Sequence, residues 1–290
     1  MWDNTPLKDG ERLLPASCSL GISPCPNDTY IFEALIHGRI AAPFSPRLHI
    51  ADVEELNAKA LRGELDVSKL SLAVVPAILE RYILLNSGGA LGRGCGPLLV
   101  ARPDLEEKER TEGRIAIPGR MTTANLLLSL HGGFRGPRLE MLFDRVMPAL
   151  CAKEAELGLI IHEGRFTYAE RGLSLVLDLG QWWEVEKNLP LPLGVIAVKR
   201  ALGRDFALAA DAAVRASLAY ARTRPDEGKK FIAAHAKEMD EDVMRRHIEL
   251  FVNRYSMDLG REGREAVLEL LRAGASESGV SLPDLPVFVE

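Results

Sequence analysis

The strongest constraint on the fold is a repeated order of apolar segments and helix-like segments along most of the first two hundred residues. Residues 17–23 (SCSLGIS) are the first apolar segment, and residues 29–38 (TYIFEALIHG) follow with helical periodicity. Asn27 or Asp28 would cap this helix and Gly38 would end it. The same order recurs in residues 47–64, 65–82, 113–133, 139–154 and 157–186. This alternation predicts an α/β fold with a largely parallel sheet.

Two similar segments bracket the middle of the chain, PLLVARPDL (97–105) and PLGVIAVKRAL (192–202). Each is Pro-Leu followed by a predicted strand. The simplest interpretation is that the chain crosses twice between two lobes, as in periplasmic-binding-protein-like folds, which hold a cleft between the lobes and two crossover strands. Two consecutive domains are the alternative.

The crossover interpretation sets the domain boundaries. It predicts a discontinuous first lobe of residues 16–102 and 200–290, a second lobe of residues 103–199, and a disordered leader of residues 1–15. From Asp205 onward apolar residues recur every three or four positions, which predicts a helical C-terminal part whose last clear helix ends at Gly274.

Composition excludes several classes of partner. The net charge is −5 and no run of Lys or Arg is long enough to follow a phosphate backbone, so nucleic acid is not an expected partner. No apolar stretch approaches the ~20 residues that span a membrane, and the first 14 residues carry five charges without an apolar core. The four cysteines are far apart and no metal-ligand spacing occurs, which predicts a cytoplasmic protein without a metal. The oligomeric state is left open.

Polar residues follow three predicted strands, where ligands bind in open α/β sheets. Residues 23–29 (SPCPNDT) form a stiff turn into a helix, Lys69 and Ser71 share one face of a strand end, and residues 122–124 (TTA) open a helix after Pro-Gly. Each pattern also fits an ordinary capped turn or solvated strand end.

His162 ends the apolar segment GLIIHE and is the histidine that follows directly on a buried strand. A neutral imidazole there would be a general base, but a hydrogen-bonded structural histidine fits equally. Glu163 would point to the opposite face of an extended strand, so the two side chains are not an evident acid–base pair.

Together these motifs resemble the 1,4-dihydroxy-6-naphthoate synthase family of the futalosine route to menaquinone. The resemblance rests on GISPCPNDTYIF, DVSKLSLA, SGGALGRGCGPLLVAR, PGRMTTANLLLSL and GLIIHEGRFTY, and covers nearly everything from Leu20 onward. Gly164 departs from it, because a small polar residue is expected there, and the leader before Ser17 is longer than the family start.

The resemblance implies a carbon–carbon lyase that converts cyclic dehypoxanthine futalosine to 1,4-dihydroxy-6-naphthoate without a cofactor. It implies that His162 accepts a proton. The substrate contacts that it implies are Lys69, Leu70, Ser71, Thr122, Thr123 and Ala124, with Asn27, Asn57 and Arg93 as weaker candidates. The alternatives are an enzyme similar to chorismate dehydratase, or a small-carboxylate binding protein without activity.

Overall fold

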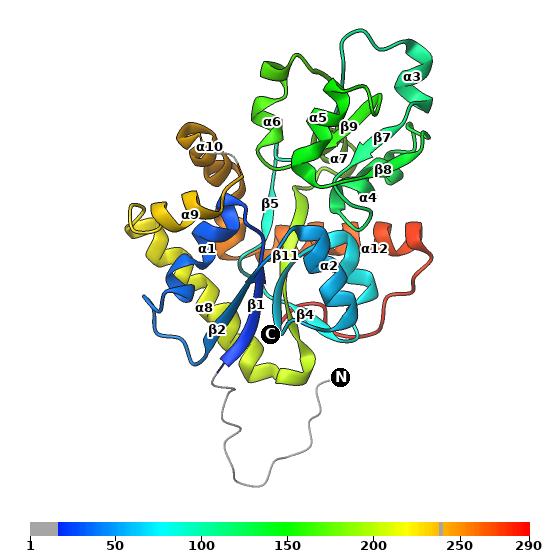
Figure 1. Ribbon diagram of the computed structural model, residues 1–290. Helices are drawn as coiled ribbons and strands as arrows, with labels where there is room; N and C mark the ends of the chain where they lie inside the picture. Colours follow the sequence, from blue (N-terminus) through cyan, green and yellow to red (C-terminus); the bar gives the residue numbers. More distant parts are fainter. Residues whose placement is uncertain (1–16, 238–239) are drawn as a thin grey trace, which may run out of the picture.

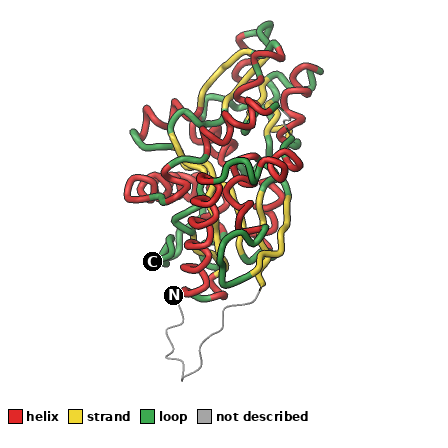
Figure 2. The backbone as a smooth tube through the Cα atoms, turned by 90° about the vertical axis from the view of Figure 1, so that its left-hand side faces the viewer, coloured by secondary structure: helices red, strands yellow, loops and turns green. Residues whose placement is uncertain are grey.

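The computed structural model describes residues 17–237 and 240–290, and the predicted leader at 1–15 lies outside this part. Two β-sheets, each covered by helices, lie one above the other (Figures 1 and 2). We call the lobe that contains strand β1 the first lobe and the lobe that contains strand β6 the second lobe. No helix of the described part is long and apolar enough to cross a membrane.

The first lobe is built on a sheet with helices on both faces. Its strands, in spatial order, are β2 (Ser45–Ile50), β1 (Ser17–Ile22), β3 (Val67–Ser71), β11 (Leu191–Lys199) and β4 (Tyr82–Leu84), with β5 (Ala90–Gly92) paired to β11. One group of helices comprises α1 (Pro26–Ile36), α8 (Arg204–Thr223), α9 (Lys229–His235), α10 (Glu241–Phe251) and α11 (Arg254–Met257). The others are α2 (Val53–Arg62), η1 (Leu72–Ala77), η4 (Arg200–Leu202) and α12 (Gly260–Ser278). Figure 1 shows α1 and α8 on one side of the sheet and α2 and α12 on the other.

The second lobe repeats this plan on a smaller scale. Its sheet has the order β10 (Ser174–Asp178), β6 (Leu98–Ala101), β9 (Leu157–Ile160), β7 (Ile115–Ile117) and β8 (Arg138–Glu140). Its helices are α3 (Glu107–Glu112), α4 (Thr123–His131), η2 (Phe143–Arg145), α5 (Val146–Cys151), α6 (Gly164–Thr167), η3 (Ala169–Arg171) and α7 (Leu179–Lys187).

The sheets are mixed, which corrects the expectation of a largely parallel sheet. Strand β1 is parallel to β2 and β3, and β7 is parallel to β8 and β9. In contrast, β11 is antiparallel to β3, β4 and β5, and β6 is antiparallel to β9 and β10. Both exceptions are crossover strands. A crossover strand enters its new sheet from the side that faces the other lobe, where the carboxyl ends of the parallel strands lie. It therefore runs antiparallel to those strands.

The crossover strands also determine where the chain changes lobes. Residues 98–101 lie in the sheet of the second lobe and residues 191–199 in that of the first. The predicted lobe boundaries at 102/103 and at 199/200 would assign each of these two strands to the opposite lobe. The domain boundaries themselves stay a prediction. One apolar cluster runs through both lobes and contains Leu70 of β3 and Leu159 of β9.

Two helix ends differ from the sequence prediction. Helix α1 begins at Pro26 because proline is well suited to the first helical position, so Asn27 and Asp28 lie inside the first turn. Helix α12 runs through Gly274 to a left-handed cap at Gly279. A Cβ at Gly274 would lie 3.0 Å from Cδ2 of Leu126 in α4, so this glycine permits close packing between the lobes rather than ending the helix.

Candidate functional site

A cavity of about 710 Å³, part of it open to solvent, lies between the two lobes. Strand ends and helix starts of both lobes line it. The predicted site residues that line it are Asn27, Lys69, Leu70, Ser71, Thr122, Thr123, Ala124 and His162. The cavity therefore gathers three of the predicted junctions and the histidine from four separate parts of the chain.

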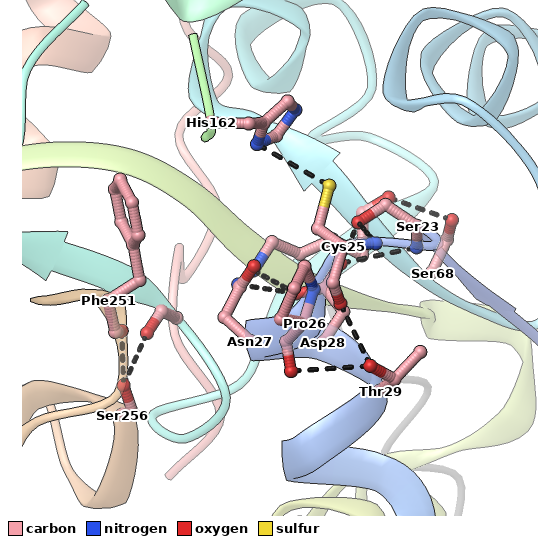
Figure 3. Close-up of polar contacts among 12 residues, drawn as sticks. Ser23, Cys25, Pro26, Asn27, Asp28, Thr29, Ser68, His162, Phe251 and Ser256 are labelled. Carbon is pink, nitrogen blue, oxygen red and sulfur yellow. Dashed lines mark hydrogen bonds and ion pairs between the residues drawn. The ribbon is translucent and has the colours of Figure 1, made fainter. Parts of the chain in front are cut away.

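The turn between β1 and α1 is organised around the carboxylate of Asp28. Ser23 donates to Asp28 Oδ2 from its backbone N at 3.2 Å and from its hydroxyl at 2.7 Å. Figure 3 shows these side chains grouped at the start of α1, below the ring of His162. Asp28 is fully buried, and a buried carboxylate needs such donors because burial of a charge without partners is costly.

A chain of polar contacts leads from Lys69 to a second histidine. Lys69 is 5% exposed and its Nζ lies 2.9 Å from Asp28 Oδ1. Nδ2 of Asn27 donates to the same oxygen at 2.9 Å, and Oδ1 of Asn27 lies 2.9 Å from Nε2 of His247 in α10. The ammonium of Lys69 is therefore paired with Asp28, and Asn27 connects this ion pair to His247.

Ser71 is held in place by Asn57, which lies behind the cavity wall. Oδ1 of Asn57 accepts from the backbone N of Ser71 at 2.9 Å, and Nδ2 donates to the Ser71 hydroxyl at 3.1 Å. Nδ2 also lies 3.2 Å from the carbonyl oxygen of Met121 in the second lobe. Because its oxygen accepts from Asn57, the Ser71 hydroxyl can direct its own hydrogen at a ligand. Asn57 itself does not line the cavity.

The start of helix α4 joins the two lobes. The hydroxyl of Thr122 accepts from the backbone N of Asn125 at 3.2 Å and caps the helix, as expected for threonine at this position. The hydroxyl of Thr123 donates to the carbonyl oxygen of Leu193 at 2.6 Å and accepts from the backbone N of Leu72 at 2.9 Å. Both hydroxyls therefore serve the fold, and a ligand at this helix start would meet backbone N–H groups.

His162 lies just beyond the end of β9, in a strained backbone conformation. Its φ is +56°, in the left-handed region that few residues other than glycine adopt. The chain then turns into α6, so the extended geometry that would send Glu163 to the opposite face is absent. Glu163 is 5% exposed and is therefore not a surface residue.

The ring of His162 reaches across to the first lobe. Its Nδ1 lies 3.4 Å from Sγ of Cys25, and Phe143 packs edge-on against it with ring centres 4.9 Å apart. Figure 3 shows the sulfur atom directed at the imidazole. Burial lowers the pKa of His162 to about 4, with the charge of Lys69 acting in the same direction and that of Asp28 opposing it. Burial also raises the pKa of the Cys25 thiol well above its ordinary value. At neutral pH the site thus holds a neutral imidazole beside a protonated thiol.

Arg93 does not reach the cavity. It is largely exposed and its guanidinium lies 3.1 Å from the carbonyl oxygen of Asn188 and 3.5 Å from Glu262. The cavity instead receives Arg165, whose Nη1 donates to the carbonyl oxygen of Gly96 at 2.5 Å.

Sequence reasoning did not select Arg165 or His247 as site residues, and it included Asp28 in the polar turn 23–29 without giving it a role of its own. Arg165 follows His162 closely in the sequence, and this proximity was the available signal. His247 lies in a long helical pattern where a histidine has no distinguishing neighbour, so only the fold brings it to the cavity. Within residues 17–237 and 240–290, no group of three or more histidine, cysteine or acidic side chains is placed to hold a metal ion.

Comparison with known proteins agrees with this arrangement. A protein-family model described as menaquinone biosynthesis matches residues 18–276. The chain is similar to 1,4-dihydroxy-6-naphthoate synthase of Thermus thermophilus, with 48% identity over 271 residues that cover 93% of this chain and 98% of the relative.

Solved structures support the fold. A protein of Archaeoglobus fulgidus superposes with a TM-score of 0.85 at 33% identity, covering 92% of this chain and 99% of that chain. The periplasmic aliphatic sulphonate binding protein of Escherichia coli superposes with a TM-score of 0.64 at 10% identity, covering 94% and 91%, and this likeness concerns the fold alone. The predicted periplasmic-binding-protein-like α/β fold is thus confirmed. The chain belongs to the menaquinone-biosynthesis family that includes 1,4-dihydroxy-6-naphthoate synthase.

Proposed function

We propose that this protein is a 1,4-dihydroxy-6-naphthoate synthase, a carbon–carbon lyase that converts cyclic dehypoxanthine futalosine to 1,4-dihydroxy-6-naphthoate. The observation that carries the proposal is a neutral imidazole, that of His162, at a cavity between the lobes in a chain 48% identical to a relative of that name. The cavity lies between two lobes, and small-molecule sites occur preferentially at such interfaces.

In this proposal His162 is the general base. A base must be unprotonated at the working pH, and the lowered pKa of His162 keeps its imidazole neutral there. His162 accepts a proton from the substrate, the released electron pair drives loss of the sugar-derived fragment, and formation of the aromatic naphthalenediol favours the product. The imidazolium then gives the proton to the departing fragment, which restores the neutral base. The protein contributes position and timing, which supply large rate factors without a cofactor.

The carboxylate of the substrate would lie against the start of α4. Ser71 can donate its hydroxyl hydrogen there, and the first N–H groups of α4 have no acceptors within the helix. Thr122, Thr123 and Ala124 contribute through the backbone in this proposal, because the two threonine hydroxyls already have partners. Leu70 and Lys69 form the adjacent wall.

Replacement of His162 by asparagine tests the general base. Asparagine tolerates the positive φ of +56° better than other residues that lack an imidazole, so the fold should be kept. We expect turnover of cyclic dehypoxanthine futalosine to fall by about 10²–10⁴-fold, the range for loss of a general base, with the Kd for substrate little changed. Formation of the naphthalenediol, followed by its absorbance, gives the rate.

His131 lies on α4 outside the cavity and provides the matched control, since His131→Asn should leave turnover unchanged. Near-normal turnover by His162→Asn would remove the base assignment. Binding without turnover by the wild-type protein would favour a non-catalytic binding protein, and dehydration of chorismate would favour the related enzyme of the pathway.

A further inference from the structure

Two imidazoles face the same cavity, from different lobes. His247 lies on α10 and is fully buried, and its ring centre is 6.1 Å from that of His162 with 29° between the ring planes. Phe251, one turn further along α10, packs against the His247 ring at 4.6 Å. The general base of the proposed reaction is His162, and that reaction as described above leaves His247 without a role.

The hydrogen bonds around Asn27 decide which nitrogen of His247 carries the proton. The carboxylate of Asp28 can only accept, so the amide group that lies 2.9 Å from it must be the NH₂ of Asn27. The amide oxygen of Asn27 then faces Nε2 of His247 at 2.9 Å and can only accept as well. Nε2 therefore carries the hydrogen, and Nδ1 of the neutral ring is an acceptor.

Nδ1 of His247 is buried and has no hydrogen-bond partner within the described part of the chain. An acceptor left without a donor costs about 1–3 kcal/mol in a protein interior, so a folded chain rarely keeps one without a use. Burial lowers the pKa of His247 well below its ordinary value, and the neighbouring His162 and Lys69 act in the same direction. The groups that face this ring from the packed elements are thus the amide of Asn27, the imidazole of His162 and the ring of Phe251.

We propose that Nδ1 of His247 accepts a hydrogen bond from a hydroxyl group of the substrate. This inference rests on the proposed function and deepens it. A neutral nitrogen that can only accept selects a hydroxyl and discriminates against a carboxylate. His247 thereby determines the orientation of the substrate, with its hydroxyl-bearing ring toward α10 and His162 and its carboxylate toward Ser71 and the start of α4.

Two ligands that differ only in their hydroxyl groups test the proposal. The probes are 1,4-dihydroxy-6-naphthoate, kept anaerobic, and 2-naphthoate, which has the same ring and carboxylate without hydroxyls. We expect His247→Leu to raise the Kd of the dihydroxy ligand about tenfold, the usual effect of one lost hydrogen bond with a buried hydroxyl left unpaired. The Kd of 2-naphthoate should stay within about twofold, because that ligand makes no such bond.

His235 on α9 provides the matched control. It lies outside the cavity and its Nδ1 is 2.8 Å from the carbonyl oxygen of Phe231, so His235→Leu should change neither Kd. Two-bond ¹H–¹⁵N spectra of the wild-type protein give an independent readout. They should show the Nε2–H form of His247, and the dihydroxy ligand should shift the Nδ1 resonance more than 2-naphthoate does.

The outcomes separate this inference from the proposed function. Three results would overturn the role of His247: an equal rise in both Kd values in His247→Leu, no rise in either Kd, or a wild-type ring protonated on Nδ1. Wild-type turnover would still support the enzyme in each case. Wild-type protein that neither converts cyclic dehypoxanthine futalosine nor binds either naphthoate would overturn the proposed function and the role of His247 with it.

Discussion

At the scale of single residues, the contact of Cys25 with His162 makes a specific prediction. The Cys25 sulfur lies 3.4 Å from Nδ1 of His162, and the raised pKa of the thiol keeps it uncharged. If this contact orients the imidazole, Cys25→Ala should lower kcat about tenfold while KM changes less than about twofold, since small errors in the position of a reacting group are costly. Steady-state kinetics on both parameters provide the measurement.

Cys151 is the control, because it is exposed on α5 and away from the cavity. Cys151→Ala should retain wild-type kinetics, and Cys25→Ser should recover part of the lost kcat because a hydroxyl can replace the thiol at Nδ1. An unchanged kcat in Cys25→Ala would show that the ring is held by its other contacts, such as that with Phe143.

The residue scale also shows what sequence patterns can and cannot select. Lys69, Ser71 and His162 each lie at or just beyond the end of a predicted strand, which made them candidates before the family resemblance was considered. The structure places all of them at the cavity. His247 was not selected because it lies within a predicted helix. Only its contact with Asn27 in the folded protein indicates a role for its ring. Arg93 was a weaker candidate that the family resemblance implied, and its side chain bonds the carbonyl oxygen of Asn188 at the surface instead.

At the scale of elements, one hydroxyl bonds helix α4 to two elements of the first lobe. Thr123 donates to Leu193 of β11 and accepts from the backbone N of Leu72 in η1. Thr123→Val has nearly the same shape but leaves both buried backbone groups unpaired. We expect it to lower the free energy of unfolding by about 1–3 kcal/mol and to weaken ligand binding, because the two lobes are less well joined.

Thr123→Ser retains the hydroxyl and is the matched control for this prediction. Its free energy of unfolding in urea should stay much closer to that of the wild type than the free energy of Thr123→Val does. If the two variants lose the same stability, the methyl group and not the hydroxyl is the important contact of Thr123.

The directions of the strands were the part of the fold that the sequence could not provide. Apolar patterning identifies β11 and β6 as strands because both are buried on both faces. The pattern of buried residues is the same for a parallel and an antiparallel neighbour, so it does not report direction. Direction follows from the route of the chain between the lobes, which is a property of the whole molecule.

At the scale of the whole molecule, a shared apolar core and a shared cavity couple the lobes. The same apolar cluster includes Leu70 of the first lobe and Leu159 of the second, so the second lobe does not pack independently. The two similar Pro-Leu segments were sufficient to predict the layout of two lobes with two crossings. They could not predict that the rings of His162 and His247 lie 6.1 Å apart between their centres, because this arrangement depends on both lobes at once.

The lowered pKa of His162 predicts that stability depends on pH. In the folded protein the pKa of His162 is about 4, compared with 6.5 for a free histidine. Between these values the unfolded chain binds a proton that the folded protein does not. The free energy of unfolding should therefore be fully retained above pH 6.5 and fall as the pH decreases toward 4. The contribution of His162 is about 2–3 kcal/mol over this interval, near the lower end because the imidazole keeps some solvent exposure.

His162→Asn isolates this contribution, because the carboxylates and other histidines that titrate in the same interval remain in the variant. Urea denaturation at about pH 4.5 to 7.5 gives the free energy of unfolding of both proteins. In this interval the unfolded histidine gains its proton. The wild-type curve should fall more steeply than that of the variant as the pH decreases, and the two should run parallel above about pH 7. Parallel curves over the whole range would mean that His162 is as accessible to protons in the folded protein as in the unfolded chain. A base so exposed would be protonated over much of this range, and the neutral imidazole on which the proposed reaction depends would be lost in mild acid.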